Sequence, residues 1–226
     1  MIPLRTHKGP RYAFAPGCAL MLYKPDVADK IYKILTAFLG DMKLLNICCH
    51  HDPKLPEKTI IINVCPGCSK RYSKDFSGIS TISLWEILSE SNFFPFPNYR
   101  GMKMSILDAC PTREDENVHE AIRTLLTRMN IQLTEPLKTR TRGSCCGDSF
   151  YGLIPVEQVK EQMKKRASEM PEEDVVVYCV SCVNSMLIGG KTPHYLVDLL
   201  FNEETRPVIV DPDLWHFELD KYIEKH

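Results

Sequence analysis

The stretch TIIINVCPGC at residues 59–68 joins a β-branched apolar run directly to a C-x-x-C motif. A second stretch, DVVVYCVSC at residues 174–182, repeats this arrangement later in the chain. Continuous apolar runs of this length are typical of strands that are buried on both faces of a parallel sheet. Both C-x-x-C motifs are therefore expected at the carboxyl end of a central strand.

The ten cysteines all belong to one five-cysteine pattern that is written twice. Each copy has a single cysteine, then an adjacent pair, then the C-x-x-C. The first copy contains Cys18, Cys48, Cys49, Cys65 and Cys68. The second copy contains Cys110, Cys145, Cys146, Cys179 and Cys182. This repetition indicates an internal duplication built around two sulfur-rich sites.

The remaining apolar patterns follow the same duplication. Short strands at residues 12–15 and 104–107 lead into Cys18 and Cys110, and each is followed by a helical pattern, over residues 27–39 and 118–129. Asp26 and Gly40 are expected near the start and the end of the first helix. Further segments, at residues 43–47 and 137–144, carry the cysteine pairs, and residues 85–88 and 197–200 are expected to be helical.

Strands that alternate with helices predict an α/β fold of two pseudo-symmetric, Rossmann-like halves with mainly parallel sheets. Pro95, Pro97 and Gly101 interrupt the pattern, so the expected domains are residues 1–97 and 98–226. Residues 3–8 and 218–226 are interpreted as polar ends. The second half has the longer spacer, and its extra length shows the helical pattern Val156, Val159, Met163 and Ala167.

Four cysteines, one pair in each half, are expected where a strand turns toward a helix. They are Cys18, Cys65, Cys110 and Cys179. In open α/β sheets, ligands bind in the crevice outside the carboxyl ends of the strands. Cysteines that lie far apart in sequence are therefore expected to converge on one spot in each half.

The bulk composition narrows the class of protein. The formal net charge of −1 gives no electrostatic footprint for nucleic acid or anionic lipid. The first residues lack the apolar core of a signal peptide, and no run approaches the roughly 18 apolar residues of a membrane helix. We expect a soluble, cytoplasmic protein, without membrane insertion, in which clustered cysteines favour metal binding or catalysis over disulfides.

Four interpretations of the clustered thiols remain open at this point: buried inert thiols, disulfides, zinc and an iron–sulfur cluster. Zinc takes four ligands, and a C-x-x-C supplies two of them. Iron–sulfur clusters are also held by thiolates, although no ferredoxin-type C-x-x-C-x-x-C run is present. Five cysteines in each half exceed the need of either an ordinary zinc site or a four-iron cube.

The second copy, with Gly147 directly after its cysteine pair, resembles the CCG cysteine-rich motif. The duplicated form, covering residues 12–200, is similar to the catalytic, CCG-containing subunit of heterodisulfide reductase and its relatives. The resemblance implies that each set of five cysteines ligates a non-cubane [4Fe-4S] cluster. It also implies that the two clusters face a shared cavity where a disulfide is cleaved reductively; in methanogens this is the disulfide of coenzymes M and B.

The first copy departs from this motif because His50, His51 and Asp52 follow its cysteine pair. A glycine at that place would allow a positive φ or a close approach to a cluster. The departure leaves zinc as an alternative in the first site. His50 and His51 are candidate extra or replacement ligands, or hydrogen-bond donors to the ligands.

Two residues other than cysteines are candidate catalytic groups. His194 is a candidate proton donor to a leaving thiolate, and Asp148 lies directly after Gly147, where it is placed to hydrogen-bond a cluster sulfide. Ser149 shares the latter expectation. Lys70 and Arg71, just after Cys68, are interpreted as surface charges.

The predicted function is that of an iron–sulfur oxidoreductase, similar to the heterodisulfide reductase catalytic subunit, acting on a small disulfide or related thiol-linked substrate. No G-x-G-x-x-G follows a strand, so no flavin or nicotinamide is expected in this chain. Electrons must then come from a partner, and the resemblance implies a ferredoxin-like iron–sulfur subunit and a flavoprotein donor. The alternatives are an electron-transfer or scaffold subunit without its own substrate, and a zinc or iron–sulfur sensor.

Overall fold

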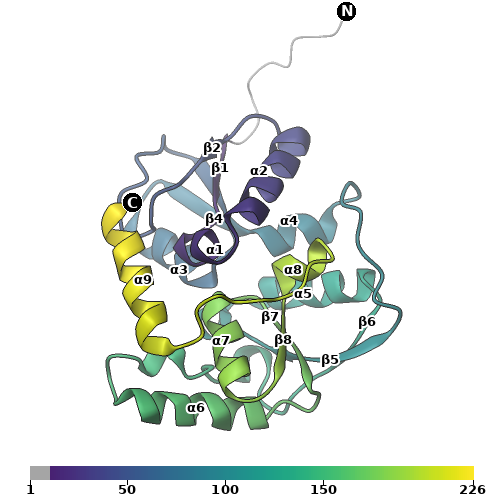
Figure 1. Cartoon of the computed structure of the whole chain (residues 1–226). Coiled ribbons are helices and arrows are strands. Elements are labelled where there is room, and N and C mark those ends of the chain that lie inside the picture. The colour runs from purple at the N-terminus through teal and green to yellow at the C-terminus, as the bar shows by residue number, and fades with distance from the viewer. Residues whose placement is uncertain (1–10) are drawn as a thin grey trace, which may run out of the picture.

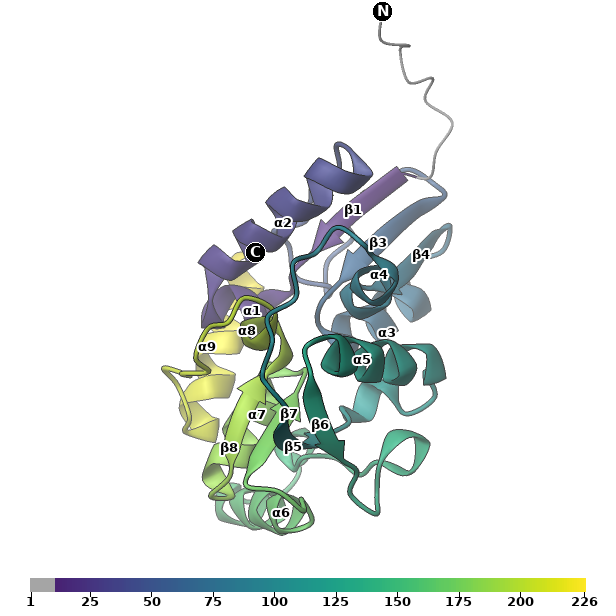
Figure 2. The same cartoon turned by 90° about the vertical axis from the view of Figure 1, so that its right-hand side faces the viewer.

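Two four-stranded sheets, each entirely parallel, organise the chain (Figures 1 and 2). The structure is a computed structural model that describes residues 11–226. The first half contains β1 (Arg11–Ala15), α1 (Cys18–Tyr23), α2 (Pro25–Leu39), β2 (Lys43–Leu44), β3 (Thr59–Asn63), α3 (Pro66–Asp75), β4 (Ile79–Ser83) and α4 (Leu84–Glu90).

The second half repeats this order with additions. Its elements are β5 (Met102–Leu107), the 3₁₀ turn η1 (Cys110–Thr112), α5 (Glu116–Arg128), β6 (Ile131–Thr134), the 3₁₀ turns η2 (Arg140–Arg142) and η3 (Asp148–Phe150), α6 (Val156–Ser168), β7 (Asp174–Val177), α7 (Val180–Ile188), β8 (Thr192–Tyr195), α8 (Leu196–Leu200) and α9 (Pro212–Lys225). Residues 91–101 connect the two halves.

The two sheets have the same topology. The strand orders are β2-β1-β3-β4 and β6-β5-β7-β8. The two central strands of each half are thus adjacent, and both are continued by cysteine-bearing segments. The expected α/β class, with two similar halves and parallel sheets, is confirmed.

Several elements differ from the sequence expectation. The edge strands β4, β6 and β8 were not anticipated, because each is short and only partly apolar. Residues 137–144 contain only the short turn η2 before the second cysteine pair. The interpretation of residues 218–226 as a polar end is wrong for most of that segment, since α9 extends to Lys225.

Helix α9 forms because Asp211 caps it and Pro212 begins it. The Asp211 carboxylate accepts hydrogen bonds from the backbone N–H groups of Asp213 and Leu214. The helix buries Trp215 and runs beside both halves, from the end of the second to the first (Figure 1). It contacts α1 directly and has no counterpart in the first half.

The two halves share one hydrophobic core. Helix α4 packs against α5, and Trp85 of α4 is 1% exposed. A buried polar contact also connects the two halves. Asp198 of α8 accepts a hydrogen bond of 2.6 Å from the Tyr23 hydroxyl and forms an ion pair of 2.7 Å with Lys24. Because Asp198 is fully buried, Lys24 is the cation that compensates its charge across the interface.

None of the helices within residues 11–226 has the length and apolar character that a membrane crossing requires.

Replacing Lys24 by methionine should therefore destabilise the protein. The substitution keeps the aliphatic stem but leaves the Asp198 carboxylate buried without its cation, and we expect a loss of about 2 kcal/mol in the free energy of unfolding. The control is Lys30→Met, which removes an ion pair of 2.6 Å from the half-exposed Lys30 to Glu203 and should cost less than about 1 kcal/mol. Urea unfolding measures both; equal losses would contradict the interpretation.

Candidate metal centres

In both halves, two cysteines lie at equivalent positions directly after the two central strands of the sheet. Cys18 starts α1 and Cys65 is the N-cap residue of α3, after the adjacent strands β1 and β3. In the second half, Cys110 starts η1 and Cys179 is the N-cap residue of α7, after β5 and β7. Parallel pairing places both chain reversals of each half at the same sheet edge, so the four cysteines form two pairs.

The five thiols of the first half are neighbours of one another. Thiol–thiol hydrogen bonds connect them in the order Cys18, Cys48, Cys49, Cys68 and Cys65. Hydrogen bonds from Cys18 and Cys49 lower the pKa of Cys48 to about 2. The hydrogen bond to Cys48 raises the pKa of Cys18. Within this set, hydrogen bonds from neighbouring thiols thus lower the pKa of both Cys48 and Cys65.

The second half repeats this arrangement. Hydrogen bonds connect its thiols in the order Cys110, Cys145, Cys146, Cys182 and Cys179. Cys145 takes the place of Cys48, and hydrogen bonds from Cys110 and Cys146 lower its pKa. The Cys145 sulfur also accepts the Gly147 N–H at 3.3 Å and lies 2.8 Å from the Ser149 hydroxyl.

These two thiol sets suit a thiolate-ligated metal group. All ten cysteines are free in the structure, and the two sets lie at the turns after the sheets. Thiolates are the ligands of iron–sulfur clusters and of structural zinc, and both need deprotonated sulfur. The residues present therefore fit an iron–sulfur or other metal site in each half.

Gly147 shapes the second site. Its φ is +113°, a conformation that L side chains rarely adopt. A Cβ at this position would lie 2.7 Å from Met163 Cγ and 2.8 Å from Met163 N, in α6. The inserted helix α6 thus packs against the cysteine loop at a place where only glycine fits.

The first site has a different close approach. Gly17, with φ +82°, precedes Cys18, and a Cβ there would lie 3.1 Å from Cys65 Cβ and 3.3 Å from Cys68 Sγ. In the second half, Ala109 occupies the equivalent position with an ordinary φ of −70°. Each half therefore has a glycine beside its cysteines that leaves no room for a side chain, against Cys65 and Cys68 in the first half and against Met163 in the second.

The two histidines after the first cysteine pair lie in different surroundings. His50 is exposed, and one ligand atom from each of Cys48, Cys49 and His50 lies within 4.8 Å of the others. His51 Nε2 lies 3.1 Å from the backbone oxygen of Ile223 in α9. His50 is thus placed to join the first thiol set, whereas His51 connects that loop to α9.

Asp108 organises the second site through a network that sequence reasoning missed. Its carboxylate accepts two hydrogen bonds from Arg123, at 2.7 and 2.8 Å, and one of 2.9 Å from the Thr139 hydroxyl. It also accepts the Arg140 N–H at 2.7 Å and the Tyr178 hydroxyl at 3.2 Å. Burial opposes ionisation of Asp108, but the Arg123 hydrogen bonds outweigh it and hold its pKa at about 2.

This network connects the three segments that carry the second thiol set. Asp108 precedes Cys110, Arg140 lies upstream of Cys145, and Tyr178 directly precedes Cys179. A signal for it was present in the sequence: Asp108 is an acidic residue within an otherwise apolar strand end. In the first half, Pro16 stands two residues before Cys18, so no equivalent carboxylate exists there.

The two candidate catalytic residues are placed differently. Asp148 lies in η3 beside the second site, and its carboxylate is 3.1 Å from His216 Nε2 of α9. The His216 ring stacks on Tyr151, with ring centroids 3.9 Å apart. His194 lies in β8, where its Nε2 is 2.6 Å from the carboxylate of Asp174, the first residue of β7. The structure therefore brings Asp148, but not His194, to the carboxyl edge of the sheet.

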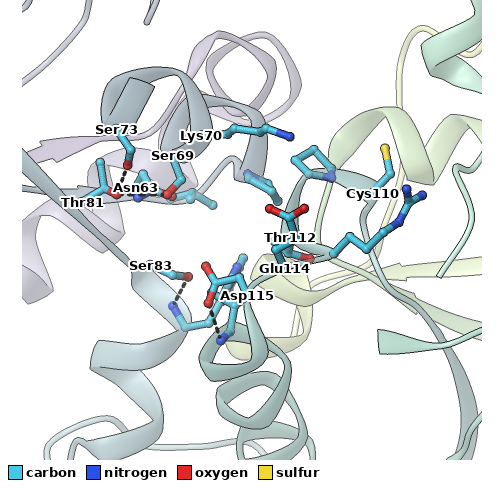
Figure 3. Close-up of a pocket in the computed structure, with 16 residues that line it drawn as sticks. Asn63, Ser69, Lys70, Ser73, Thr81, Ser83, Cys110, Thr112, Glu114 and Asp115 are labelled. Carbon is cyan, nitrogen blue, oxygen red and sulfur yellow. Dashed lines mark hydrogen bonds between the residues drawn. The ribbon is translucent and has the colours of Figure 1, made fainter. Parts of the chain in front are cut away.

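A cleft lies between the two halves beside the second site (Figure 3). One cavity of about 320 Å³ and an adjoining one of about 380 Å³ share three lining residues, Lys70, Cys110 and Pro111. In Figure 3 the Lys70 side chain extends from α3 toward the side of the cleft where Cys110 lies. The resemblance implied a cavity shared by the two halves, but the residues that line this cleft depend on how the halves pack and could not be predicted from the sequence.

Comparison with known proteins supports the class of this site. Residues 105–187 match the model of the cysteine-rich domain family CCG, and this segment contains all five cysteines of the second set. The resemblance of the second five-cysteine copy to the CCG motif is therefore confirmed for residues 105–187, at the level of that family.

Two other comparisons add little. No curated protein sequence matches the chain. Among solved structures, that of Picrophilus torridus aspartate racemase is similar over 96% of this chain and 95% of its own chain, at 12% sequence identity and a TM-score of 0.31. A likeness at that TM-score supports no conclusion about this protein.

Replacing Gly147 by alanine should destabilise the apoprotein by about 3 kcal/mol, because the new Cβ meets Met163 and the backbone conformation is strained. The metal content of the second site should fall with it. The matched control is Gly152→Ala, since Gly152 has a φ of +78° but open space around it, and we expect a cost of about 1 kcal/mol there. Urea unfolding and metal analysis test this; equal effects would contradict the role of the Met163 contact.

Replacing Asp108 by asparagine should weaken the second site while leaving the first intact. The variant leaves Arg123 without its buried anion and should lose about 3 kcal/mol of stability. Glu135→Gln is the control, because Glu135 pairs with the same Arg123 at 2.9 Å but is about one third exposed and should cost less than about 1 kcal/mol. Metal analysis of the two variants tests this, because only Asp108→Asn should lower the metal content. An equal loss of metal in both variants would contradict a role of Asp108 in positioning the second thiol set.

Proposed function

We propose that this protein is an iron–sulfur oxidoreductase, similar to the catalytic subunit of heterodisulfide reductase, that reductively cleaves a small disulfide or a related thiol-linked substrate. The observation that carries the proposal is the pair of clustered five-thiol sets, one beside a cleft between the halves. A disulfide takes up two electrons and two protons to give two thiols. When bound, iron–sulfur clusters supply such electrons one at a time.

The ten cysteines would hold the two groups, which we propose to be non-cubane [4Fe-4S] clusters. The sites lie on elements that touch across the two halves: α3, which contains Cys68, contacts η1, which begins with Cys110, and α1, which begins with Cys18, contacts α7, which contains Cys182. This proximity suits a pair of one-electron groups that serve one two-electron reaction.

The chain's own residues would position the reaction and supply its protons. The Asp108 network orients the segments before Cys110 and Cys179. Asp148 and His194 are the candidate sources of the proton that a leaving thiolate needs. Asp148 is the better placed of the two, because it lies after Cys146 and hydrogen-bonds His216, whereas His194 is bonded to Asp174 at the amino end of β7.

The electrons would come from outside the chain. We propose a ferredoxin-like iron–sulfur subunit, fed by a flavoprotein, as the donor. Ten free thiols also suit a reducing compartment, and a cytoplasmic location is part of the proposal. A scaffold or electron-transfer subunit without its own substrate would contain the same clusters but would cleave no disulfide.

Protein purified without oxygen should contain about eight iron atoms per chain, four for each cluster. Cys145→Ser should reduce this to about four, and Cys48→Ser should do the same from the other half. The loaded protein, reduced chemically, should then convert a small disulfide into two thiols per two electrons. A chain that contains no iron under these conditions would refute the cluster assignment, and an iron-loaded chain that leaves every disulfide intact would favour the scaffold function.

Zinc in the first site is a second candidate, supported by the grouping of Cys48, Cys49 and His50. Three such ligand atoms within 4.8 Å suit a tetrahedral ion. In this case the same metal analysis should find about four iron atoms and one zinc ion per chain. His50→Ala should then lower the zinc content without changing the iron content.

A further inference from the structure

One cysteine in each half occupies the same place in its thiol set. Cys48 and Cys145 are the first members of the two adjacent pairs, and each accepts hydrogen bonds from two neighbouring thiols. Each sulfur also accepts a hydrogen bond from the backbone N–H two residues further on, which belongs to His50 in the first half and to Gly147 in the second. Since the backbone gives both sulfurs the same donor, a difference in hydrogen bonding between them must come from side chains.

The second half has a side-chain donor at this place. The Ser149 hydroxyl lies 2.8 Å from the Cys145 sulfur, and Ser149 follows Cys145 by four residues. The turn η3 holds the serine there, because the Phe150 N–H donates a hydrogen bond to the Gly147 carbonyl at 3.1 Å. A thiolate has no proton, so a Cys145 that binds a metal can only accept, and the Ser149 hydroxyl is then the donor.

The first half has no such donor. The residue four positions after Cys48 is Asp52, whose carboxylate has no proton to donate and instead accepts the Lys54 N–H at 2.8 Å. Within residues 11–226, no side-chain hydroxyl donates a hydrogen bond to Cys48. Cys48 is also 1% exposed, whereas Cys145 is only partly buried. The two sulfurs therefore share a backbone donor and differ by one hydroxyl.

The surroundings of Cys145 carry an excess of positive charge. A small cavity of about 150 Å³ lies beside Cys145, and the charged residues that line it are Lys138, Lys165, Arg166 and Glu169. Glu169 pairs with Lys138 at 3.0 Å and also with Arg166. In the described part of the chain, no carboxylate lies within ion-pair distance of Lys165. The lining of this cavity is therefore positive overall.

Both features favour the reduced form of a metal group held by Cys145. Reduction adds negative charge that spreads onto the ligand sulfurs, and hydrogen bonds to those sulfurs are among the factors that set the reduction potential of an iron–sulfur cluster. Asp148 opposes this effect, since its carboxylate lies beside the second set, but its printed partner is His216, at 3.1 Å, and not a thiol. The Ser149 hydroxyl is the side-chain group that reaches a sulfur directly.

We propose that Ser149 is a positioning residue that acts through Cys145: its hydroxyl donates a hydrogen bond to the ligand sulfur and raises the reduction potential of the metal group in the second site. The inference rests on the proposed function for the kind of group that is bound. It adds that the two sites differ in electron affinity. When both sites hold iron–sulfur groups, an electron shared between them resides on the second, which is reduced as the first is oxidised.

The test is a redox titration of the iron-loaded protein without oxygen, followed by electron paramagnetic resonance. Ser149→Ala should lower the potential of the second site, so that its ratio of reduced to oxidised form at a fixed potential falls about tenfold, which corresponds to about 59 mV for one electron. A signal from the first site should stay in place and serves as the internal reference. Ser149→Thr keeps the hydroxyl and should keep the original potential.

The matched control is Ser144→Ala. Ser144 directly precedes Cys145 and, within residues 11–226, makes no hydrogen bond to its sulfur, so this variant should leave the potential of the second site unchanged. Three outcomes would overturn the inference: no shift in Ser149→Ala, equal shifts in Ser149→Ala and Ser144→Ala, or equal shifts in Ser149→Ala and Ser149→Thr. A merely structural role of Ser149 would not produce a shift that the threonine hydroxyl restores.

Failure of this inference and failure of the proposed function can be told apart. A protein that cleaves disulfides but has the same potential in Ser149→Ala keeps its function and lacks the effect of Ser149. A protein whose potential depends on Ser149 but that cleaves no disulfide has that effect and lacks the reductase activity.

Cobalt(II) provides a readout that does not depend on iron. In apoprotein loaded with cobalt(II) alone, the sulfur-to-cobalt charge-transfer absorption should shift in Ser149→Ala and stay unchanged in Ser144→Ala, because a hydrogen bond to the ligand sulfur changes the energy of its electrons. If the chain binds no iron, the proposed function fails, and an unchanged cobalt absorption in Ser149→Ala would overturn the inference as well.

Discussion

Each half places two parallel strands at its centre, and the pairing of those strands determines where its thiols meet. Ala15 of β1 is paired with Asn63 of β3, and Leu107 of β5 with Val177 of β7. Cys18 and Cys110 follow three residues after these pairs, and Cys65 and Cys179 follow two residues after them. The same offsets in both halves bring two cysteines together at each sheet edge, and the C-x-x-C adds the next thiol one helical turn on. The adjacent pair then arrives in a loop that follows the edge strand. A slip of one residue in the central pairing would move the strand ends apart and turn inward side chains outward.

Although the two halves share this strand pairing, different contacts hold the cysteine-bearing segments of the two sites in place. In the second half, the Asp108 carboxylate connects the segments of Cys110, Cys145 and Cys179, and Gly147 lets the inserted helix α6 approach the cysteine loop. The first half has Pro16 in place of Asp108 and His50 in place of Gly147. Its thiols are instead packed closely around Gly17 and covered by α9. Both halves thus keep the same five-cysteine pattern, whereas the contacts around it differ; the residues that match the CCG family model, 105–187, lie in the second half.

The sequence predicted the central strands and the long helices because strong local patterns specify them. The Ile-rich run before Cys65 and the Val-rich run before Cys179 are apolar throughout, and α6 was visible from four apolar residues at helical spacing. The edge strands β6 and β8 have four residues each and take their conformation from a neighbouring strand rather than from their own pattern. Helix α9 was missed because its apolar face is interrupted by polar residues, although Asp211 and Pro212 are a recognisable helix start. The partners of Asp108 and the lining of the cleft depend on tertiary packing; the local sequence signalled only that Asp108 is an acidic residue at an apolar strand end.

The position of α9 makes the surroundings of the two sites unequal. It continues from the second half and ends against the first, where Ile223 lies over the thiols and its backbone oxygen contacts His51. Near its start, His216 reaches Asp148 and Trp215 reaches Ser181, both beside the second thiol set. One helix therefore contacts both sites on the same side of the molecule and closes that side more completely over the first. The opposite side, between α3 and Cys110, stays open and positively charged. The surroundings of the two thiol sets therefore differ in how open they are, although the number of thiols in each set is the same.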